Sequence, residues 1–266
     1  EKLGSHRFFV CIQGSDATHV ISCYLTKGKR TRDSEEKLVS ECLEALIGIA
    51  CGVSSELPKL SQNIEYEVVK SKKEWTQLID SEIEFIKCQE EISRLIFPGT
   101  FNPIHEGHLQ IKEIAEKMTK QKLFFEISVS NVDKAPLSYY EIQKTIEQFS
   151  KEHRWVLTNA PTFQEKIKLF PKSTFVVGTD TLMRIFDQKY YQDQLSMNKA
   201  LECFDEYDAR FIVFGREIEK TFRSLEDLKI PTSMLHRFEG VSENEFRMDI
   251  RSRDIKRSNE ESRRPA

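Results

Sequence analysis

Residues 97–109, FPGTFNPIHEGHL, hold two of the chain's six histidines, His105 and His108, where an apolar run gives way to a helical pattern. The run at 94–97, RLIF, has the composition of a short buried strand, and from His108 onward apolar residues recur at helical spacing. The stretch is therefore predicted to form a glycine-containing loop between a strand and a helix.

Such a loop is a candidate phosphate site. The first amides of a helix lack intrahelical partners, and the helix dipole adds partial positive charge there. His105 and His108 would share a face near that helix terminus and donate hydrogen bonds to one phosphate chain. Gly99 and Gly107 let the backbone approach a ligand, and Pro103 stiffens the turn. Two isolated histidines are more often solvated or capping side chains, but the strand and helix around this pair favour the phosphate site.

The segment GTFNPIHEGH at 99–108 resembles the first motif of the HxGH nucleotidyltransferase superfamily, which has a cytidylyltransferase-like domain. It is most similar to the motif of nicotinate or nicotinamide mononucleotide adenylyltransferases, and less so to that of cytidylyltransferases and pantetheine-phosphate adenylyltransferase. The resemblance implies that His105 and His108 are catalytic. It also implies nucleotide contacts from Gly99, Thr100, Phe101, Asn102 and Gly107.

Composition excludes several other classes. The 266 residues are 39% hydrophobic with a formal charge of −3, which suits one large or two modest domains and does not indicate a nucleic-acid or membrane partner. The longest apolar stretch, near 45–50, is far shorter than the roughly 20 residues that span a bilayer, and no signal-peptide pattern opens the chain. A cytoplasmic protein is expected, and a homo-oligomer remains open.

Scattered cysteines point to reduced thiols. No CxxC pair and no histidine at zinc-like spacing accompanies them, so neither a disulfide nor a protein-bound metal is expected. The cysteines are Cys11, Cys23, Cys42, Cys51, Cys88 and Cys203.

The N-terminal region has its own pattern. Residues 7–12 and 19–25 have strand composition and are predicted to form a hairpin. Residues 35–51 carry apolar residues at helical spacing, with Ser34 as the expected N-cap and Gly52 as the stop. These elements predict a strand, strand, helix unit.

This unit, assigned to 1–55, resembles the end of the competence/damage-inducible protein C-terminal domain, which has a nicotinamide-mononucleotide amidase-like fold. The likeness rests on pattern, and the catalytic residues of that family lie upstream of the matched part, so it implies no deamidase activity. The basic loop at 27–32 is expected to be a solvated hairpin end. Because the chain opens on Glu1 and enters a strand quickly, it is expected to be cut from a longer protein.

Residues 56–91 are polar and are predicted to be a helical connector with one helix at 73–86. Over 92–258 strands and helices alternate, which predicts an α/β, Rossmann-like doubly wound parallel sheet of nucleotidyltransferase type, preceded by the small α+β fragment. Residues 259–266 are expected to be a basic tail. The predicted strands are 94–97, 123–129, 155–158, 173–177 and 210–214, and the predicted helices are 138–149, 163–170 and one starting at 181.

Further candidates follow the predicted strands. Lys134 lies in a loop where the superfamily has a phosphate-contacting lysine, so the resemblance makes it catalytic; otherwise it is a surface lysine. Gly178 allows close approach, and Asp180 would hold ribose hydroxyls or cap the following helix. Arg216 would bind phosphate or pair with a neighbouring glutamate.

The segment IRSRDIK at 250–256 resembles the superfamily's ISSTxIR segment, which closes the triphosphate pocket. Ser252 keeps its place, whereas Arg251 and Arg253 stand where small hydroxyl residues are usual and Lys256 replaces the arginine. Ser252 and Arg253 are therefore expected to bind nucleotide. A basic C-terminal helix is the alternative.

Nucleotidyl transfer needs alignment and charge stabilisation but no protein nucleophile, and no GxSxG elbow or P-loop is present. Under the leading hypothesis, the protein joins ATP to nicotinate or nicotinamide mononucleotide in NAD biosynthesis and releases pyrophosphate. A Mg²⁺ ion that bridges substrate phosphates is expected to take part. Two alternatives stay open. One is a cytidylyltransferase using CTP, or an adenylyltransferase with another small phosphorylated acceptor; the other is a nucleotide-binding regulatory protein without turnover.

Overall fold

The computed structural model describes residues 5–26, 28, 30–53, 64–89, 91–132 and 135–248. They fall into two compact units. The described residues of the first unit come from Glu1–Thr76 and Leu137–Ile146, and those of the second from Gln77–Pro136 and Glu147–Ser252. None of the helices in the described part of the chain has both the length and the apolar composition needed to cross a bilayer.

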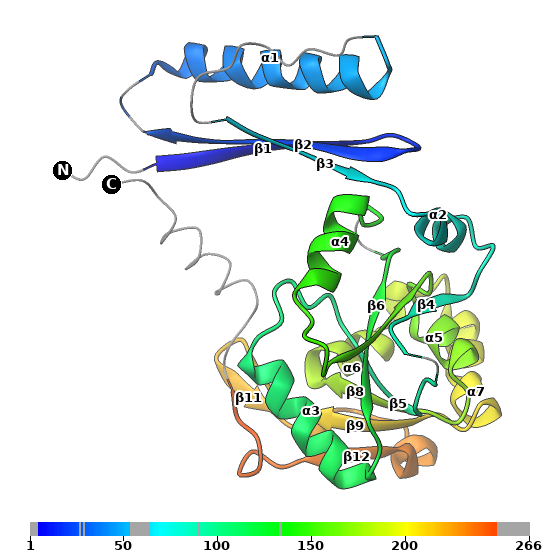
Figure 1. Ribbon diagram of the computed structural model, residues 1–266. Helices are drawn as coiled ribbons and strands as arrows, with labels where there is room; N and C mark the ends of the chain where they lie inside the picture. The colour runs from blue at the N-terminus through cyan, green and yellow to red at the C-terminus, as the bar shows by residue number, and fades with distance from the viewer. Residues whose placement is uncertain are drawn as a thin grey trace. The chain divides into compact units, whose positions relative to one another are not determined.

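The first unit is a three-stranded antiparallel sheet with one long helix on it (Figure 1). The predicted hairpin is confirmed as β1 (Ser5–Gln13) and β2 (Ala17–Thr26), and the predicted helix as α1 (Arg32–Ala50). The helix packs on the sheet because both have an apolar face, formed by Ile21, Cys23, Leu25, Leu38, Cys42 and Leu46.

The start of α1 differs from the prediction. Its N-cap is Thr31, whose Oγ1 accepts a hydrogen bond from the Ser34 backbone N–H at 3.3 Å. The helix begins before Ser34 because Thr31 can serve this cap and Arg32 pairs with Glu36 one turn later. The predicted stop is confirmed, since Gly52 follows the last turn with a φ of 68°.

The prediction that residues 56–91 form a helical connector is wrong in two places. Residues 64–70, IEYEVVK, form β3 (Ile64–Lys70), which pairs antiparallel with β2. The helix predicted at 73–86 is shorter, α2 (Lys73–Ile79), and is followed by the strand β4 (Phe85–Lys87). Alternating apolar and charged residues favour a strand at 64–70 in spite of the polar composition.

A helix from the middle of the chain also serves the first unit. The Tyr139 backbone N–H at the start of α4 (Tyr139–Glu147) donates to Gln13 Oε1 at 2.8 Å and Thr18 Oγ1 at 3.1 Å. The Tyr139 hydroxyl donates to the Ser15 carbonyl at 3.2 Å, and Tyr140 packs against Phe9 with ring centroids 5.9 Å apart. These contacts attach the first turns of α4 to the small sheet.

The second unit is built on a seven-stranded sheet with the order β12-β9-β8-β5-β6-β7-β4. Neighbouring strands are parallel except β4, which is antiparallel to β7. The predicted α/β, Rossmann-like parallel sheet is therefore confirmed. Its strands, with β4, are β5 (Leu95–Pro98), β6 (Leu123–Ser128), β7 (Arg154–Thr158), β8 (Thr174–Gly178), β9 (Arg210–Phe214) and β12 (Phe238–Val241).

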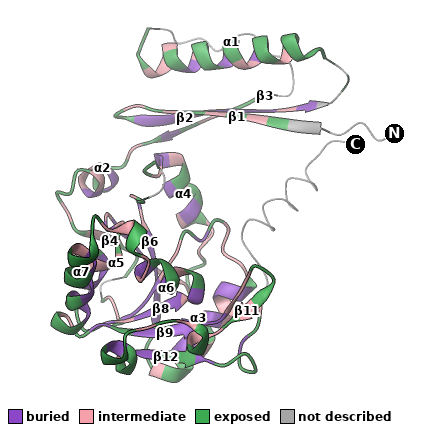
Figure 2. Cartoon of the chain, turned by 180° about the vertical axis from the view of Figure 1, so that it is seen from behind, coloured by how far each residue is buried: buried purple, intermediate pink, exposed green. Residues whose placement is uncertain are grey.

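Helices connect these strands, and a hairpin follows β9. The central strands are buried, as Figure 2 shows for β8 and β9, because apolar side chains from both faces are covered by helices. A core cluster of buried apolar residues joins the sheet to α5, α6 and α7. The helices are α3 (Glu106–Thr119), α5 (Phe163–Leu169), α6 (Thr179–Ile185) and α7 (Gln194–Glu206), the hairpin strands are β10 (Arg216–Ile218) and β11 (Thr221–Arg223), and short 3-10 turns occupy Gln188–Tyr190, Leu225–Asp227 and Thr232–Arg237.

The order of the strands indicates where a ligand would bind. β5 lies between β6 and β8, so the chain proceeds from β5 to one side and later returns to its other side. In doubly wound sheets ligands bind beyond the carboxyl ends of the strands at this reversal. The loops that follow β5, β8 and β9 hold most of the residues that the sequence singles out.

Candidate active site

The histidine pair lies at the start of α3. His105 is the N-cap, with extended backbone angles of −148° and 170°, and His108 is in the first turn. The helix thus starts two residues earlier than predicted. The His105 backbone N–H donates to His108 Nδ1 at 3.2 Å, and the two rings stack with centroids 3.7 Å apart at 25°. The motif spacing therefore joins the two imidazoles as one group.

This hydrogen bond fixes which nitrogen of His108 carries a proton. A backbone N–H can only donate, so Nδ1 must accept, and the neutral ring is protonated on Nε2. Burial, followed by the nearby charges of His105 and Arg216, lowers the pKa of His108 to about 3. The same two causes, burial and then Arg216, lower the pKa of His105. Near neutral pH the pair is uncharged and His108 presents Nε2–H as a donor.

Aromatic side chains support the His108 ring. The edges of Phe97 and Phe101 meet it with centroids 5.9 and 5.0 Å away. Phe101 is 1% exposed and also packs on Phe125, although its φ of 41° is unusual for a residue with a side chain. Because the Phe101 side chain is buried, only its backbone could make the nucleotide contact that the sequence predicts. Its ring instead holds the histidine loop on the sheet.

Gly107 is closely packed at the helix start. A Cβ added there would lie 3.0 Å from Met248 Sδ and 3.1 Å from the His105 ring atoms Cε1 and Nδ1. A side chain at this position would therefore force the His105 ring or Met248 to move by a few tenths of an ångström. Met248, which the sequence analysis did not single out, therefore lies against the histidine loop. Only the packing of the folded chain reveals it, since a lone methionine carries no motif signal.

A second group of candidates lies at the ends of β8 and β9. A Cβ added to Gly178 would lie 2.5 Å from Asp180 Oδ1 and 3.3 Å from Arg216 Cγ and Nε. The backbone of β8 is therefore overlaid by both a carboxylate and a guanidinium. Thr179, fully buried beside them, donates through Oγ1 to the Arg223 carbonyl at 3.2 Å and so ties α6 to β11.

Arg216 connects the two groups. Its charge acts on both histidines, so its guanidinium lies near the α3 terminus as well as over Gly178. Among the described residues Arg216 has no ion pair, and its buried Nε has no hydrogen-bond partner, so the predicted alternative of a glutamate partner finds no support in that part of the chain. The buried His105 Nδ1 also lacks a hydrogen-bond partner there. A cation and two imidazoles with unused hydrogen-bonding atoms can chemically bind an anion.

The remaining candidates divide into two sets. Thr100 and Asn102 are exposed on the loop between Gly99 and the histidines, and Asn102 is joined to Pro103 by a cis peptide bond. Lys134, Ser252 and Arg253 lie outside the described residues, as do Arg251 and Lys256. The structure brings together the candidates His105, Gly107, His108, Gly178, Asp180 and Arg216.

The lowered pKa of His108 predicts a pH dependence of stability. The unfolded residue titrates near 6.5 and the folded one near 3, so the unfolded state binds more protons between these values and stability falls as the pH drops. The titration of His108 should therefore lower the free energy of unfolding by about 2 kcal/mol between pH 7 and pH 5. Urea unfolding at both pH values should show a smaller pH effect in His108→Asn than in wild type, whereas the exposed-site control His236→Asn should match wild type. Equal pH effects in all three proteins would contradict the buried neutral histidine.

Comparison with known proteins agrees with this geometry. No curated protein matches the chain. Residues 96–258, more than half of the chain, match the family model described as Cytidylyltransferase-like. The match begins within β5 and takes in the histidine loop, Gly178, Asp180 and Arg216. The chain therefore belongs to the cytidylyltransferase-like family, whose activity in general is nucleotidyl transfer.

Proposed function

We propose that this protein transfers a nucleotidyl group from a nucleoside triphosphate to a small phosphorylated acceptor, with the triphosphate held by His105, His108 and Arg216. The observation that supports it best is Arg216. It is a partly buried cation without a carboxylate partner among the described residues, beside two imidazoles whose pKa values are lowered. A polyphosphate would supply the negative charge that Arg216 lacks, and its oxygens would accept hydrogen bonds from the unused N–H groups.

The reaction follows from this placement. A phosphate oxygen of the acceptor attacks the α-phosphorus in line, a new P–O bond forms, and the bond to the pyrophosphate leaving group breaks. His108, neutral and protonated on Nε2, stabilises the developing negative charge by donating a hydrogen bond. Arg216 neutralises the outer phosphates. The proposal assigns the protein alignment and charge stabilisation, and no covalent intermediate.

Magnesium would be carried by the substrate. The described residues contain no group of three or more His, Cys, Asp or Glu side chains placed to hold a metal ion. Mg²⁺ bound to triphosphates keeps several waters and is held largely by phosphate oxygens, so the site has to accommodate the ion without a dedicated cage. Asp180, whose Oδ1 lies over Gly178 as Arg216 does, would bind ribose hydroxyls or an ion-bound water.

For the substrates we propose ATP and nicotinate or nicotinamide mononucleotide, on the strength of the GTFNPIHEGH segment and its resemblance to adenylyltransferases of pyridine mononucleotides. The test is pyrophosphate release with Mg²⁺, ATP or CTP, and a panel of acceptors that includes both pyridine mononucleotides, pantetheine phosphate and a phosphorylated alcohol. Release with ATP and a pyridine mononucleotide supports the proposal. Release with CTP alone selects the cytidylyltransferase alternative, and no release with any pair rejects the transferase activity.

Arg216 gives a binding prediction. Replacing Arg216 by Gln should weaken triphosphate binding roughly 10- to 100-fold, because a hydrogen bond to a charged group contributes about 1.5–3 kcal/mol. Binding of the nucleoside itself should change little. Titration calorimetry with a triphosphate and its nucleoside checks both. Arg210→Gln is the matched control, since Arg210 lies at the start of β9 with 68% of its side chain exposed. Equal losses for the two variants would count against a phosphate role for Arg216.

A further inference from the structure

One side chain holds both ends of the turn that precedes the histidine pair. Gln148 Nε2 donates to the Phe101 carbonyl, and Gln148 Oε1 accepts the Ile104 backbone N–H at 2.7 Å. Within the described residues these two backbone groups have no other hydrogen bond. The primary amide thus supplies one donor and one acceptor to opposite sides of a four-residue turn, as a neighbouring peptide group would.

The residue after Gln148 adds apolar contacts to this pair of hydrogen bonds, which we call the clamp. Phe149 packs on Phe101 with centroids 6.1 Å apart and on Phe125 at 5.3 Å. Phe101 in turn meets the His108 ring at 5.0 Å. Residues 148 and 149 therefore fix the turn through its backbone and its largest side chain at once.

The amide that Gln148 holds is next in the chain to the amide that orients His108. Gln148 orients the Ile104 N–H, and the next amide along the chain, that of His105, donates to His108 Nδ1. This second bond selects the His108 tautomer that presents Nε2–H. A shift of the Ile104 peptide plane would move the His105 amide and loosen the stacked pair.

We propose that Gln148 is a positioning residue, which holds the two imidazoles in register without touching the substrate. The catalytic part of this proposal rests on the nucleotidyl transfer proposed above. Its structural part, the control of the histidine geometry, stands apart from any turnover.

The structural part is tested by NMR on the folded protein. In Gln148→Ala the Ile104 amide should exchange with solvent at least about 10-fold faster, because it loses its hydrogen bond. The pKa of His108 should rise from its low value as the pair loosens and water enters. Gln121→Ala, which removes an exposed glutamine after α3, is the control. Unchanged Ile104 exchange or an unchanged His108 titration in Gln148→Ala would overturn the proposal even if the wild type transfers no nucleotide.

The catalytic part is tested by the split between kcat and the binding of substrate. Gln148→Ala should lower kcat about 10- to 100-fold, since a misplacement of about 1 Å in a catalytic group has effects of this size, while triphosphate affinity stays within about 3-fold. Gln148→Glu gives a distinct signature. Its carboxylate can accept from Ile104 but cannot donate to Phe101, and protonation restores the donor, so its kcat relative to wild type should rise as the pH falls. A parallel loss of kcat and affinity, or a Gln148→Glu ratio that ignores pH, would show a general loss of structure and overturn the positioning role.

Discussion

The variant His108→Asn is expected to lose about 10²- to 10³-fold in kcat, the effect of removing one preorganised donor to a developing oxyanion. The asparagine oxygen can still accept the His105 backbone N–H, as Nδ1 does, so the start of α3 should stay folded. What disappears is the Nε2–H donor. Pyrophosphate release in the presence of Mg²⁺ and a productive substrate pair measures the loss.

Three companions make this result specific. Triphosphate affinity should fall far less than kcat, because the lost hydrogen bond is strongest when the leaving group is charged. His108→Gln places an amide donor nearer to Nε2 and should recover part of the rate. His236→Asn changes an exposed histidine in a 3-10 turn and should keep wild-type activity. A His108→Asn enzyme with wild-type kcat would falsify the assigned role.

The sequence was enough to predict five of the seven strands in the sheet of the second unit, because their signals are local, whereas β4 and β12 were not predicted. Apolar runs such as 123–129 and helical spacing after His108 gave the alternation of strands and helices, and the observed sheet has these strands in parallel order. The histidine loop was likewise placed between a strand and a helix, where it lies. Element starts were less accurate, as at α1 and α3, because a cap depends on which nearby side chain reaches the free amides.

The strand β3 shows where composition misleads. Residues 64–70 contain two glutamates and a lysine, and a polar connector was predicted there. The period-two alternation of Ile64, Tyr66 and Val68 with charged residues is the stronger signal for extended backbone, although Tyr66 and Val68 are exposed and the buried residue lies on the opposite face of the strand. Val69 is 3% exposed, and the strand completes the sheet through β2.

The parts of the site that escaped prediction depend on long-range contacts. The Gln148 amide meets a turn 44 residues earlier in the chain, and Met248 lies over Gly107 from near the end of the described residues. Neither glutamine nor methionine has a motif signature, so no local pattern identifies them. Arg216 follows a predicted strand, but the absence of a glutamate partner among the described residues is visible only in the folded surroundings.

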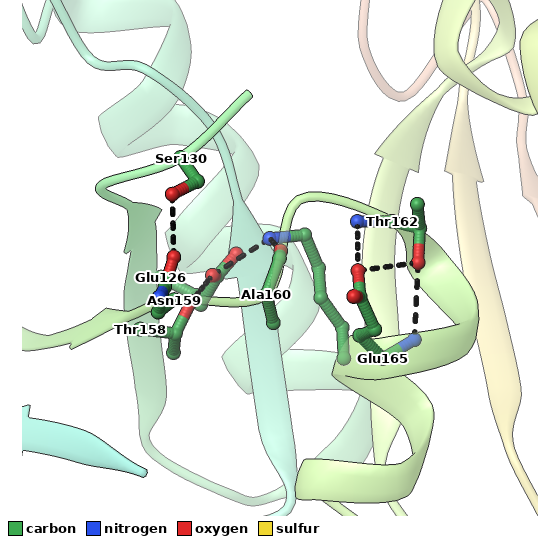
Figure 3. A network of polar contacts seen from close by, with 8 residues as sticks. Glu126, Ser130, Thr158, Asn159, Ala160, Thr162 and Glu165 are labelled. Atoms are coloured by element: carbon green, nitrogen blue, oxygen red, sulfur yellow. Dashed lines mark hydrogen bonds and ion pairs between the residues drawn. The ribbon is translucent and has the colours of Figure 1, made fainter. Parts of the chain in front are cut away.

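The second large effect is expected at a buried ion pair between β6 and α5, whose surroundings are drawn in Figure 3. Glu126 is fully buried, and its Oε1 accepts hydrogen bonds from Lys166 Nζ at 2.7 Å and from Thr158 Oγ1. Lys166, 6% exposed, also donates to the Ala160 carbonyl at 2.6 Å. The pair joins β6 to α5, and the Glu126 carbonyl accepts the Gly99 N–H at the start of the histidine loop.

Lys166→Met should therefore lower the free energy of unfolding by about 3–5 kcal/mol, because it leaves a buried carboxylate without a counter-charge. Urea unfolding measured by circular dichroism gives the loss. Lys168→Met, an exposed position on the same helix, should stay within about 0.5 kcal/mol of wild type.

The double variant Glu126→Met with Lys166→Met separates the two contributions to this loss. Replacing a buried ion pair by apolar residues of similar volume is often neutral or stabilising, so the double variant should recover most of the stability that Lys166→Met loses. If the double variant is instead as unstable as Lys166→Met, the loss comes from lost packing of the lysine stem and its bond to Ala160. Recovery would show that the lysine is retained mainly to neutralise Glu126, whose own backbone positions the first residue of the histidine loop.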